Sequence, residues 1–241
     1  DCTKLKELRL PDQLSEIEDF AFYGCWQLEG INLPKKIMSI GKYAFAGCSK
    51  MTLSDSVFSS QLYIVDDYAF KDCHSINAVK LSPSIKVLGE GVFSGCNNLE
   101  FCQMPSTYLR IPDFFFSGCT KLNQLSYSSE IEYVGRCSFK DCTSLNRITI
   151  PPSCKELLGN PFGGLNRDSI VIDNPNFYYE NGLLIDTNNN AVISYCAVES
   201  AADIIIPKGI VKICANAFEN SDIASVSLPC STFSSEAPSV R

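Results

Sequence analysis

The sequence has very little histidine and no surplus of positive charge. Its 241 residues include one histidine, one tryptophan and three methionines. A single histidine excludes most histidine-based catalysis and most metal sites built from imidazole ligands. The 27 Asp and Glu residues outnumber the 20 Lys and Arg residues, which gives a net charge of −7. Because nucleic-acid binding needs a basic face, we expect no nucleic-acid partner.

Long apolar runs and paired cysteine motifs are also missing. No stretch approaches the roughly 18 apolar residues that a membrane helix needs, so we expect no membrane insertion of this segment. The chain has 13 cysteines but no C-x-x-C motif. Zinc ribbons and thioredoxin-like redox sites therefore have no support. We expect no cofactor, no metal and no catalytic residue.

The strongest feature that is present is an internal repeat. A cysteine recurs every 23 residues, with one step of 25, at Cys2, Cys25, Cys48, Cys73, Cys96, Cys119 and Cys142. A phenylalanine keeps one position in eight copies, at Phe22, Phe45, Phe70, Phe93, Phe116, Phe139, Phe162 and Phe218. Alternating apolar residues and often a proline follow the cysteine, as in Leu8, Leu10 and Pro11. A repeat of this length is typical of a solenoid.

Each repeat predicts one turn of that solenoid. The alternating segment that ends at proline predicts a very short strand, since proline cannot donate to a hydrogen-bond ladder. Too few residues remain for a long helix, so the return side should contain turns, 3₁₀ pieces or short strands. No turn buries its own apolar side, so the turns must stack. About nine strands at roughly 4.8 Å spacing would make one elongated domain about 40–50 Å long.

These motifs resemble the BspA-type leucine-rich repeats of surface and secreted proteins. The resemblance rests on segments such as IGKYAFAGCSKM, LGEGVFSGCNNL and VGRCSFKDCTSLNRITIP, and it covers nearly the whole chain. It implies an α/β-type leucine-rich-repeat solenoid with short parallel strands on the concave face. It also implies export to a cell surface or secretion, and adhesion to host or matrix proteins. The sequence shows no signal peptide and starts within the array, so we expect a mature or trimmed fragment.

The array is expected to fill residues 1–230 as one domain, with residues 231–241 as a loose tail. An insertion at about 166–206 interrupts it. There, apolar runs at 177–185 and 191–195 flank the turn-forming cluster 186–190, which predicts a β-hairpin. The third repeat is longer around residues 54–60, where we expect an outward bulge. The seventh has Leu165 in place of the cysteine.

The repeated cysteines are expected to form a ladder of buried free thiols. Free cysteine is among the most buried residue types, and stacked parallel turns do not readily give the matched Cβ directions of a disulfide. One or two incidental bridges are the alternative. Cys102 and Cys154 take apolar core positions of the repeat, and Cys230 is the expected exposed thiol.

Two other motifs have a chemical and a structural interpretation. Cys73 and His74 are adjacent and could form a nucleophile–base pair, but a surface turn histidine beside a core cysteine is the simpler reading. Residues 186–190 resemble the start of a calcium loop but lack its glycine and its bidentate glutamate. A tight turn rich in Asp and Asn is the expected structure.

The candidate binding residues lie at the fifth and seventh positions after each repeated cysteine. These positions alternate with buried ones, so their side chains should point outward from the strand. Phe101 and Arg147 form the predicted hot spot, because aromatic residues and arginine dominate binding energies. Tyr178 and Tyr179 of the hairpin form a second candidate patch. The complete candidate set is Arg9, Asn32, Lys80, Phe101, Gln103, Gln124, Arg147, Tyr178 and Tyr179.

Three functions fit these features. The leading hypothesis is a non-enzymatic, monomeric surface or secreted module that binds a host, matrix or neighbouring-cell protein through its concave face. The alternative is a structural stalk or spacer of a larger surface protein. A glycan-binding accessory protein is the third, and it would require a cluster of exposed aromatic side chains. In the sequence, only Tyr178 and Tyr179 suggest such a cluster.

Overall fold

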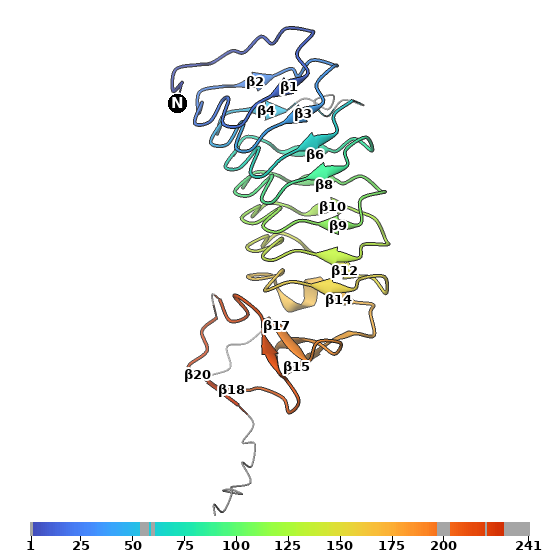
Figure 1. Ribbon diagram of the computed structural model, residues 1–241. Coiled ribbons are helices and arrows are strands. Elements are labelled where there is room, and N and C mark those ends of the chain that lie inside the picture. Colours follow the sequence, from blue (N-terminus) through green and yellow to red (C-terminus); the bar gives the residue numbers. More distant parts are fainter. Residues whose placement is uncertain (1, 54–57, 59–60, 197–202, 220, 229–241) are drawn as a thin grey trace, which may run out of the picture.

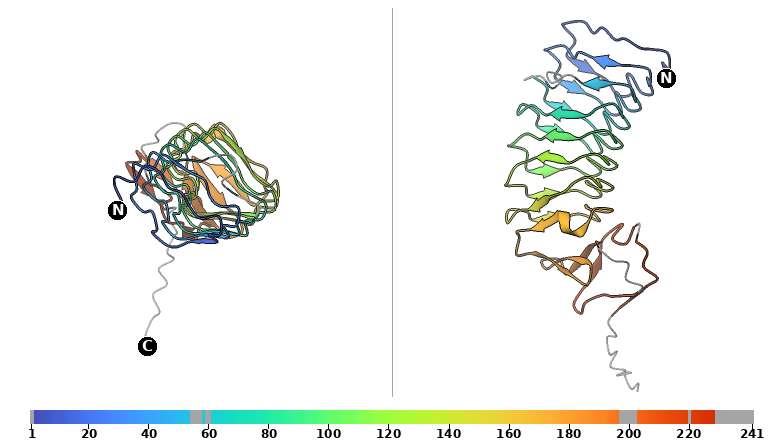
Figure 2. Two further views of the ribbon diagram at one scale, coloured as in Figure 1. Left: turned by 90° about the horizontal axis from the view of Figure 1, so that it is seen from above. Right: turned by 180° about the vertical axis from the view of Figure 1, so that it is seen from behind.

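The computed structural model describes residues 2–53, 58, 61–196, 203–219 and 221–228. The chain winds into an elongated solenoid in which each turn stacks on the preceding one (Figure 1). Seen along the solenoid axis, the turns lie over one another around a common interior (Figure 2). Strands of two or three residues recur at two places in each turn, so two parallel ladders run along the molecule.

The first ladder follows each repeated cysteine, where the alternating pattern predicts a strand. In β6 and β8 the middle residue is buried and its neighbours face outward, as expected for period-two alternation. The strands of this ladder are β2 (Gly30–Ile31), β4 (Thr52–Leu53), β6 (Ala78–Lys80), β8 (Phe101–Gln103), β10 (Gln124–Ser126), β12 (Ile148–Ile150) and β14 (Ile170–Ile172).

The second ladder lies on the return side of each turn. Its strands have two residues, of which the second is buried in the core. They are β1 (Glu16–Ile17), β3 (Ser39–Ile40), β5 (Ile64–Val65), β7 (Val87–Leu88), β9 (Arg110–Ile111), β11 (Tyr133–Val134) and β13 (Glu156–Leu157). The short-strand form of the predicted return side is therefore the one that the protein adopts.

The α/β part of the predicted fold class is not confirmed. In the part of the chain that the structure describes, the one helical element is the three-residue 3₁₀ helix η1 (Arg167–Ser169). Two short strands and the turns between them use up each repeat, so no stretch is long enough for an α-helix. The fold is a parallel β-solenoid.

The core is a column of phenylalanine rings from the repeated position. Neighbouring rings are nearly parallel, with centroids 5.3 Å apart for Phe22 and Phe45 and 6.0 Å apart for Phe139 and Phe162. Phe58, from the longer third repeat, packs edge-on against Phe70 at 5.8 Å. Each ring thus fills the space between two turns, which binds the turns into one core.

The repeated cysteines connect successive turns. The thiol of each donates a hydrogen bond of 3.1–3.2 Å to the phenylalanine carbonyl of the preceding turn, at Cys48, Cys73, Cys96, Cys119 and Cys142. Burial raises the pKa of Cys48 and of Cys96 to about 12, so both thiols stay protonated at neutral pH. The twelve cysteines in the described ranges are free.

The predicted burial of the cysteines is confirmed at most positions but not at all of them. Six of the seven ladder positions are buried, as are Cys102 and Cys154. Cys2 is exposed, so the prediction is wrong there: among the described residues only the turn that follows packs against it. Cys230 lies outside the described residues, as do the tail and most of the longer segment of the third repeat.

A hydrogen bond between an aspartate side chain and the backbone of the next turn recurs at every second turn. Asp67 accepts the backbone N–H of Glu90 through Oδ1 at 2.9 Å, one turn further along. A Cβ atom at Gly89 would lie 2.3 Å from the Asp67 nitrogen, so only glycine fits there. The same contact recurs two turns earlier and two turns later, from Asp19 to Lys42 past Gly41 and from Asp113 to Arg136 past Gly135.

The insertion forms an antiparallel unit at the lower end of the solenoid in Figure 1. It has three strands rather than the two arms that the sequence predicts: β15 (Phe177–Glu180), β16 (Leu183–Asp186) and β17 (Ala191–Tyr195). Asn181 and Gly182, both with positive φ, make the extra turn inside the first arm. β17 then pairs in parallel with β19 (Lys212–Ile213), and β18 (Asp203–Ile205) pairs with β20 (Ser225–Ser227).

Candidate interaction surfaces

Each ladder contains a break where a tyrosine replaces an aliphatic core residue. Between β6 and β14, the strand pairing of the first ladder is interrupted between β10 and β12. The strand pairing of the second ladder is interrupted between β7 and β9. At the first break the Tyr127 hydroxyl accepts the Thr149 N–H at 2.9 Å and donates to its carbonyl at 2.8 Å. Tyr108 makes the corresponding two contacts with Leu88 at the second break. The tyrosine hydroxyls thus replace the backbone hydrogen bonds that a paired neighbouring strand would supply.

The break in the first ladder opens a groove of about 370 Å³ at its edge. Its lining is mostly apolar and comes from three successive turns: Tyr127, Ser129, Thr149, Pro151, Pro152 and Asp173. Burial raises the pKa of Tyr127, and the bond to Thr149 and the positive charge of Arg147 oppose this shift. An apolar side chain of a partner fits this lining better than a charged one does.

The predicted strip lies on the outer face of the first ladder. Phe101 and Gln124 are direct partners in adjacent strands, as are Lys80 and Gln103. Arg147 comes just before β12 and is exposed. Phe101 is half-buried, so it presents less surface than an outward position implies. The hot-spot pair is two turns apart, with Gln124 in the turn between them.

At the N-terminal end, the strip residues Arg9 and Asn32 line one groove. Its volume is about 610 Å³, and its other lining residues are Leu8, Leu10, Asp12, Gln13, Leu33, Pro34, Lys35 and Lys36. Of the candidate residues of the strip, Arg9 and Asn32 line this groove, and the others follow the ladder from β6 to the start of β12.

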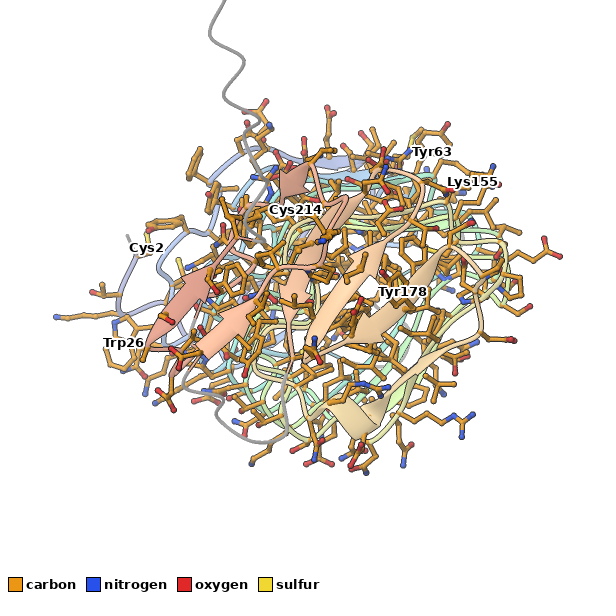
Figure 3. All side chains as sticks on the ribbon, turned by 90° about the horizontal axis from the view of Figure 1, so that it is seen from below. Cys2, Trp26, Tyr63, Lys155, Tyr178 and Cys214 are labelled. Carbon is orange, nitrogen blue, oxygen red and sulfur yellow. The ribbon has the colours of Figure 1, made fainter. Side chains whose placement is uncertain are left out.

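The two hairpin tyrosines do not form one patch. Tyr178 is 40% exposed and lies at the end of the solenoid (Figure 3). Tyr179 is largely buried, with the Arg167 guanidinium 3.8 Å from its ring centroid. Neighbouring residues in a strand point to opposite faces, which separates the two side chains.

The sequence analysis missed a column of aromatic rings on the outside of the first three turns. Phe20, Tyr43 and Tyr68 stand two residues before the core phenylalanine, all with φ between 53° and 58°. Their rings stack with centroids 5.2 and 5.0 Å apart and interplanar angles of 6° and 14°. In the fourth turn Gly91 takes this position, and the Tyr68 ring lies over it. Non-glycine residues are uncommon at positive φ, so sequence alone did not reveal these sites.

Tyr23 extends this column, and Trp26 is an exposed aromatic side chain that follows it in the same turn. The Tyr23 ring stands across those of Phe20 and Tyr43, at centroid distances of 5.9 and 6.4 Å. Trp26 is three residues further on, and the Lys50 ammonium lies 5.6 Å from its ring centroid. We call Phe20, Tyr23, Trp26, Tyr43 and Tyr68 the surface aromatic cluster.

The second ladder also has an exposed apolar face. Met38, Tyr63 and Val87, from three successive turns, are each more than 40% exposed. Figure 3 shows Tyr63 and Trp26 on opposite sides of the solenoid.

The residues considered for metal or covalent chemistry have structural contacts instead. Asp186 is buried and accepts the backbone N–H groups of Asn188 and Asn189, so its carboxylate holds the tight turn. His74 Nδ1 lies 2.9 Å from the Gly95 carbonyl, and Cys73 is buried. No group of three or more His, Cys, Asp or Glu side chains could hold a metal within the described ranges. Those ranges also contain no helix long and apolar enough to cross a membrane.

Short parallel strands stacked around a phenylalanine column, with open faces on all sides, define a repeat scaffold of the solenoid class. The sequence model described as the BspA type leucine rich repeat region matches six copies, over residues 1–55, 50–167 and 171–237. The chain therefore belongs to the BspA-type leucine-rich repeat family. Membership of this family indicates a protein-interaction module. No curated protein matches the sequence.

Solved structures support the fold. The chain is similar to a leucine-rich cell surface protein from Faecalibacterium prausnitzii, with 23% identity, a TM-score of 0.57 and coverage of 93% of this chain and 55% of that one. A leucine-rich repeat protein from Bacteroides ovatus has 22% identity, a TM-score of 0.56 and coverage of 95% and 62%. The chain thus spans little more than half the length of these two proteins.

Proposed function

We propose that the protein is a non-enzymatic, monomeric cell-surface or secreted module that adheres to a host, matrix or neighbouring-cell protein. The outer face of the first ladder supplies the contact, with the groove between β10 and β12 at its centre. The observation that carries this proposal is the groove itself, because an apolar opening beside exposed polar residues is where a partner's anchoring side chain is best desolvated. A surface location is supported by the description of the Faecalibacterium neighbour.

The surroundings of the groove have the composition of a protein interface. Tyr127, Pro151 and Pro152 provide the apolar lining, and the Asp173 carboxylate lies at its rim. Arg147, two residues before Thr149 in the same turn, is exposed and supplies a cation that can pair with a partner carboxylate. Phe101 and Gln124 continue the face along the ladder. Protein interfaces commonly combine an apolar centre with a polar rim of this kind.

Blocking the groove tests this proposal directly. Ser129 is exposed and lines the groove, so Ser129→Trp fills it without changing the core. Ser106 occupies the same repeat position one turn earlier and is also exposed, so Ser106→Trp is the matched control. Binding to immobilised matrix proteins and to an epithelial surface extract should be lost in the first variant and kept in the second.

A Phe101→Ser/Arg147→Glu double variant, shown by circular dichroism to be folded, tests the rest of the face. Loss of binding in this variant would show that the contact with the partner extends along the ladder beyond the groove. Binding that survives both it and Ser129→Trp would place the contact on another surface. If the unaltered chain binds no protein, the stalk or spacer function replaces the proposal.

A further inference from the structure

The N-terminal turns expose an unusual amount of aromatic surface. Phe20, Tyr23 and Trp26 are 55%, 46% and 44% exposed, and they are three of the five exposed aromatic side chains in the described part of the chain. All three lie within seven residues. Contiguous exposed apolar surface of this kind marks interaction sites in soluble proteins.

The rings are held in place by one another, so the surface exists before any ligand binds. Tyr43 is stacked between Phe20 and Tyr68. The Tyr23 ring makes interplanar angles of 67° with Phe20 and 73° with Tyr43. This arrangement leaves the outer face of Phe20 at the surface. The Trp26 ring is exposed beside it in sequence, with the Lys50 ammonium over it as a cation at this end of the site. A rigid aromatic platform loses little conformational entropy when a ligand stacks on it.

A row of polar groups continues from Trp26 along the solenoid. The same repeat position in later turns is occupied by Ser49, His74, Asn97, Thr120 and Thr143. These are hydroxyl, imidazole and amide groups, with no carboxylate and no ammonium group among them, and the last three are exposed. Successive turns are about 4.8 Å apart, so a polar side chain recurs at each such step. The Thr120 and Thr143 hydroxyls donate to backbone carbonyls of the preceding turn, which leaves their oxygens as acceptors for a ligand.

We propose that the surface aromatic cluster and this polar row form a binding site for an uncharged polysaccharide that lies along the solenoid. The C–H faces of pyranose rings pack against exposed aromatic rings, and their hydroxyls exchange hydrogen bonds with amides and alcohols. The absence of charged groups from the row favours a neutral glycan over a protein segment, whose recognition generally uses charge as well. The aromatic end of this site lies in the first turns, several turns away from the groove between β10 and β12.

Trp26 reports directly on this site because it is the only tryptophan in the chain. Its fluorescence should change and saturate on titration with at least one of three soluble neutral probes: β-1,3-glucan, xylan and galactomannan. Tyr23→Ala should weaken that binding about tenfold, the loss expected for one stacked ring. Tyr63→Ala removes an equally exposed ring on the opposite side and should leave the affinity unchanged.

Circular dichroism and thermal melts establish that both variants are folded. No fluorescence change with any of the three neutral probes would overturn the proposal. A change with the acidic polymer hyaluronan alone would overturn the assignment to uncharged glycans. A change with matrix protein but with no polysaccharide would identify the cluster as a protein-binding surface instead. Because Ser129→Trp leaves this site intact, failure here is distinguishable from failure at the groove.

Discussion

Replacing Tyr127 with phenylalanine removes one oxygen atom from the break in the first ladder. That hydroxyl makes two hydrogen bonds with the Thr149 backbone, at 2.9 and 2.8 Å, in a partly buried position. Each bond contributes about 0.5–1.5 kcal/mol, so Tyr127→Phe should destabilise the protein by about 1–3 kcal/mol. For a domain of this size, 1 kcal/mol lowers Tm by roughly 2–4 °C, which predicts a decrease of about 2–12 °C.

Tyr178→Phe is the matched control for this measurement. Its hydroxyl contacts only the Glu180 carboxylate, at 3.4 Å and in an exposed position, so its loss should change Tm very little. Thermal melts followed by circular dichroism compare the two variants under identical conditions. Equal melting temperatures would refute the idea that Tyr127 replaces a strand at the break.

Three further predictions follow from the core, one ion pair and the thiols. Phe93→Ala should cost about 3–5 kcal/mol in chemical denaturation, because a fully buried ring leaves a cavity, and an unchanged midpoint would contradict the stacked core. Bonds from Lys140 and Asn216 lower the pKa of Glu219, so their stabilisation is present at neutral pH and is lost as the pH falls through this lowered value. Melts of Glu219→Gln and the unaltered chain should therefore differ modestly at pH 7 and converge once the pH has fallen through this lowered pKa, and a gap that persists in acid would contradict this. Iodoacetamide should label exposed Cys2 long before buried Cys73 in the folded protein, as mass spectrometry of peptides would show, and equal rates would argue against the thiol ladder.

The repeated positions explain why so much of the fold could be predicted from the sequence. A cysteine and a phenylalanine that keep fixed places in successive repeats indicate the length of each turn, the position of the strand and the line of the core. Cys102 and Cys154 were correctly placed in that core because they occupy apolar positions of the pattern.

The surfaces could not be predicted in the same way, since they depend on contacts between turns. Tyr127 and Tyr108 look like ordinary core substitutions until the neighbouring backbone that they contact is known. Phe20 and Tyr43 do not show in the sequence that they adopt positive φ and stack. The departure from an aliphatic residue is the signal that could have indicated Tyr127 and Tyr108. For Phe20 and Tyr43 it is the recurrence of an aromatic residue two positions before the core phenylalanine.

The aspartate–glycine contacts between turns alternate along the array, and this limits how its length can change. The contact made by Asp67 recurs at Asp113, 46 residues later, although the sequence repeat is half as long. Deleting the single turn between Asp19 and Asp67 would bring Asp66 to the place where only glycine fits. Deleting two turns would bring Gly89 there and restore the contact. Natural or engineered variants of this array should therefore gain or lose turns in pairs.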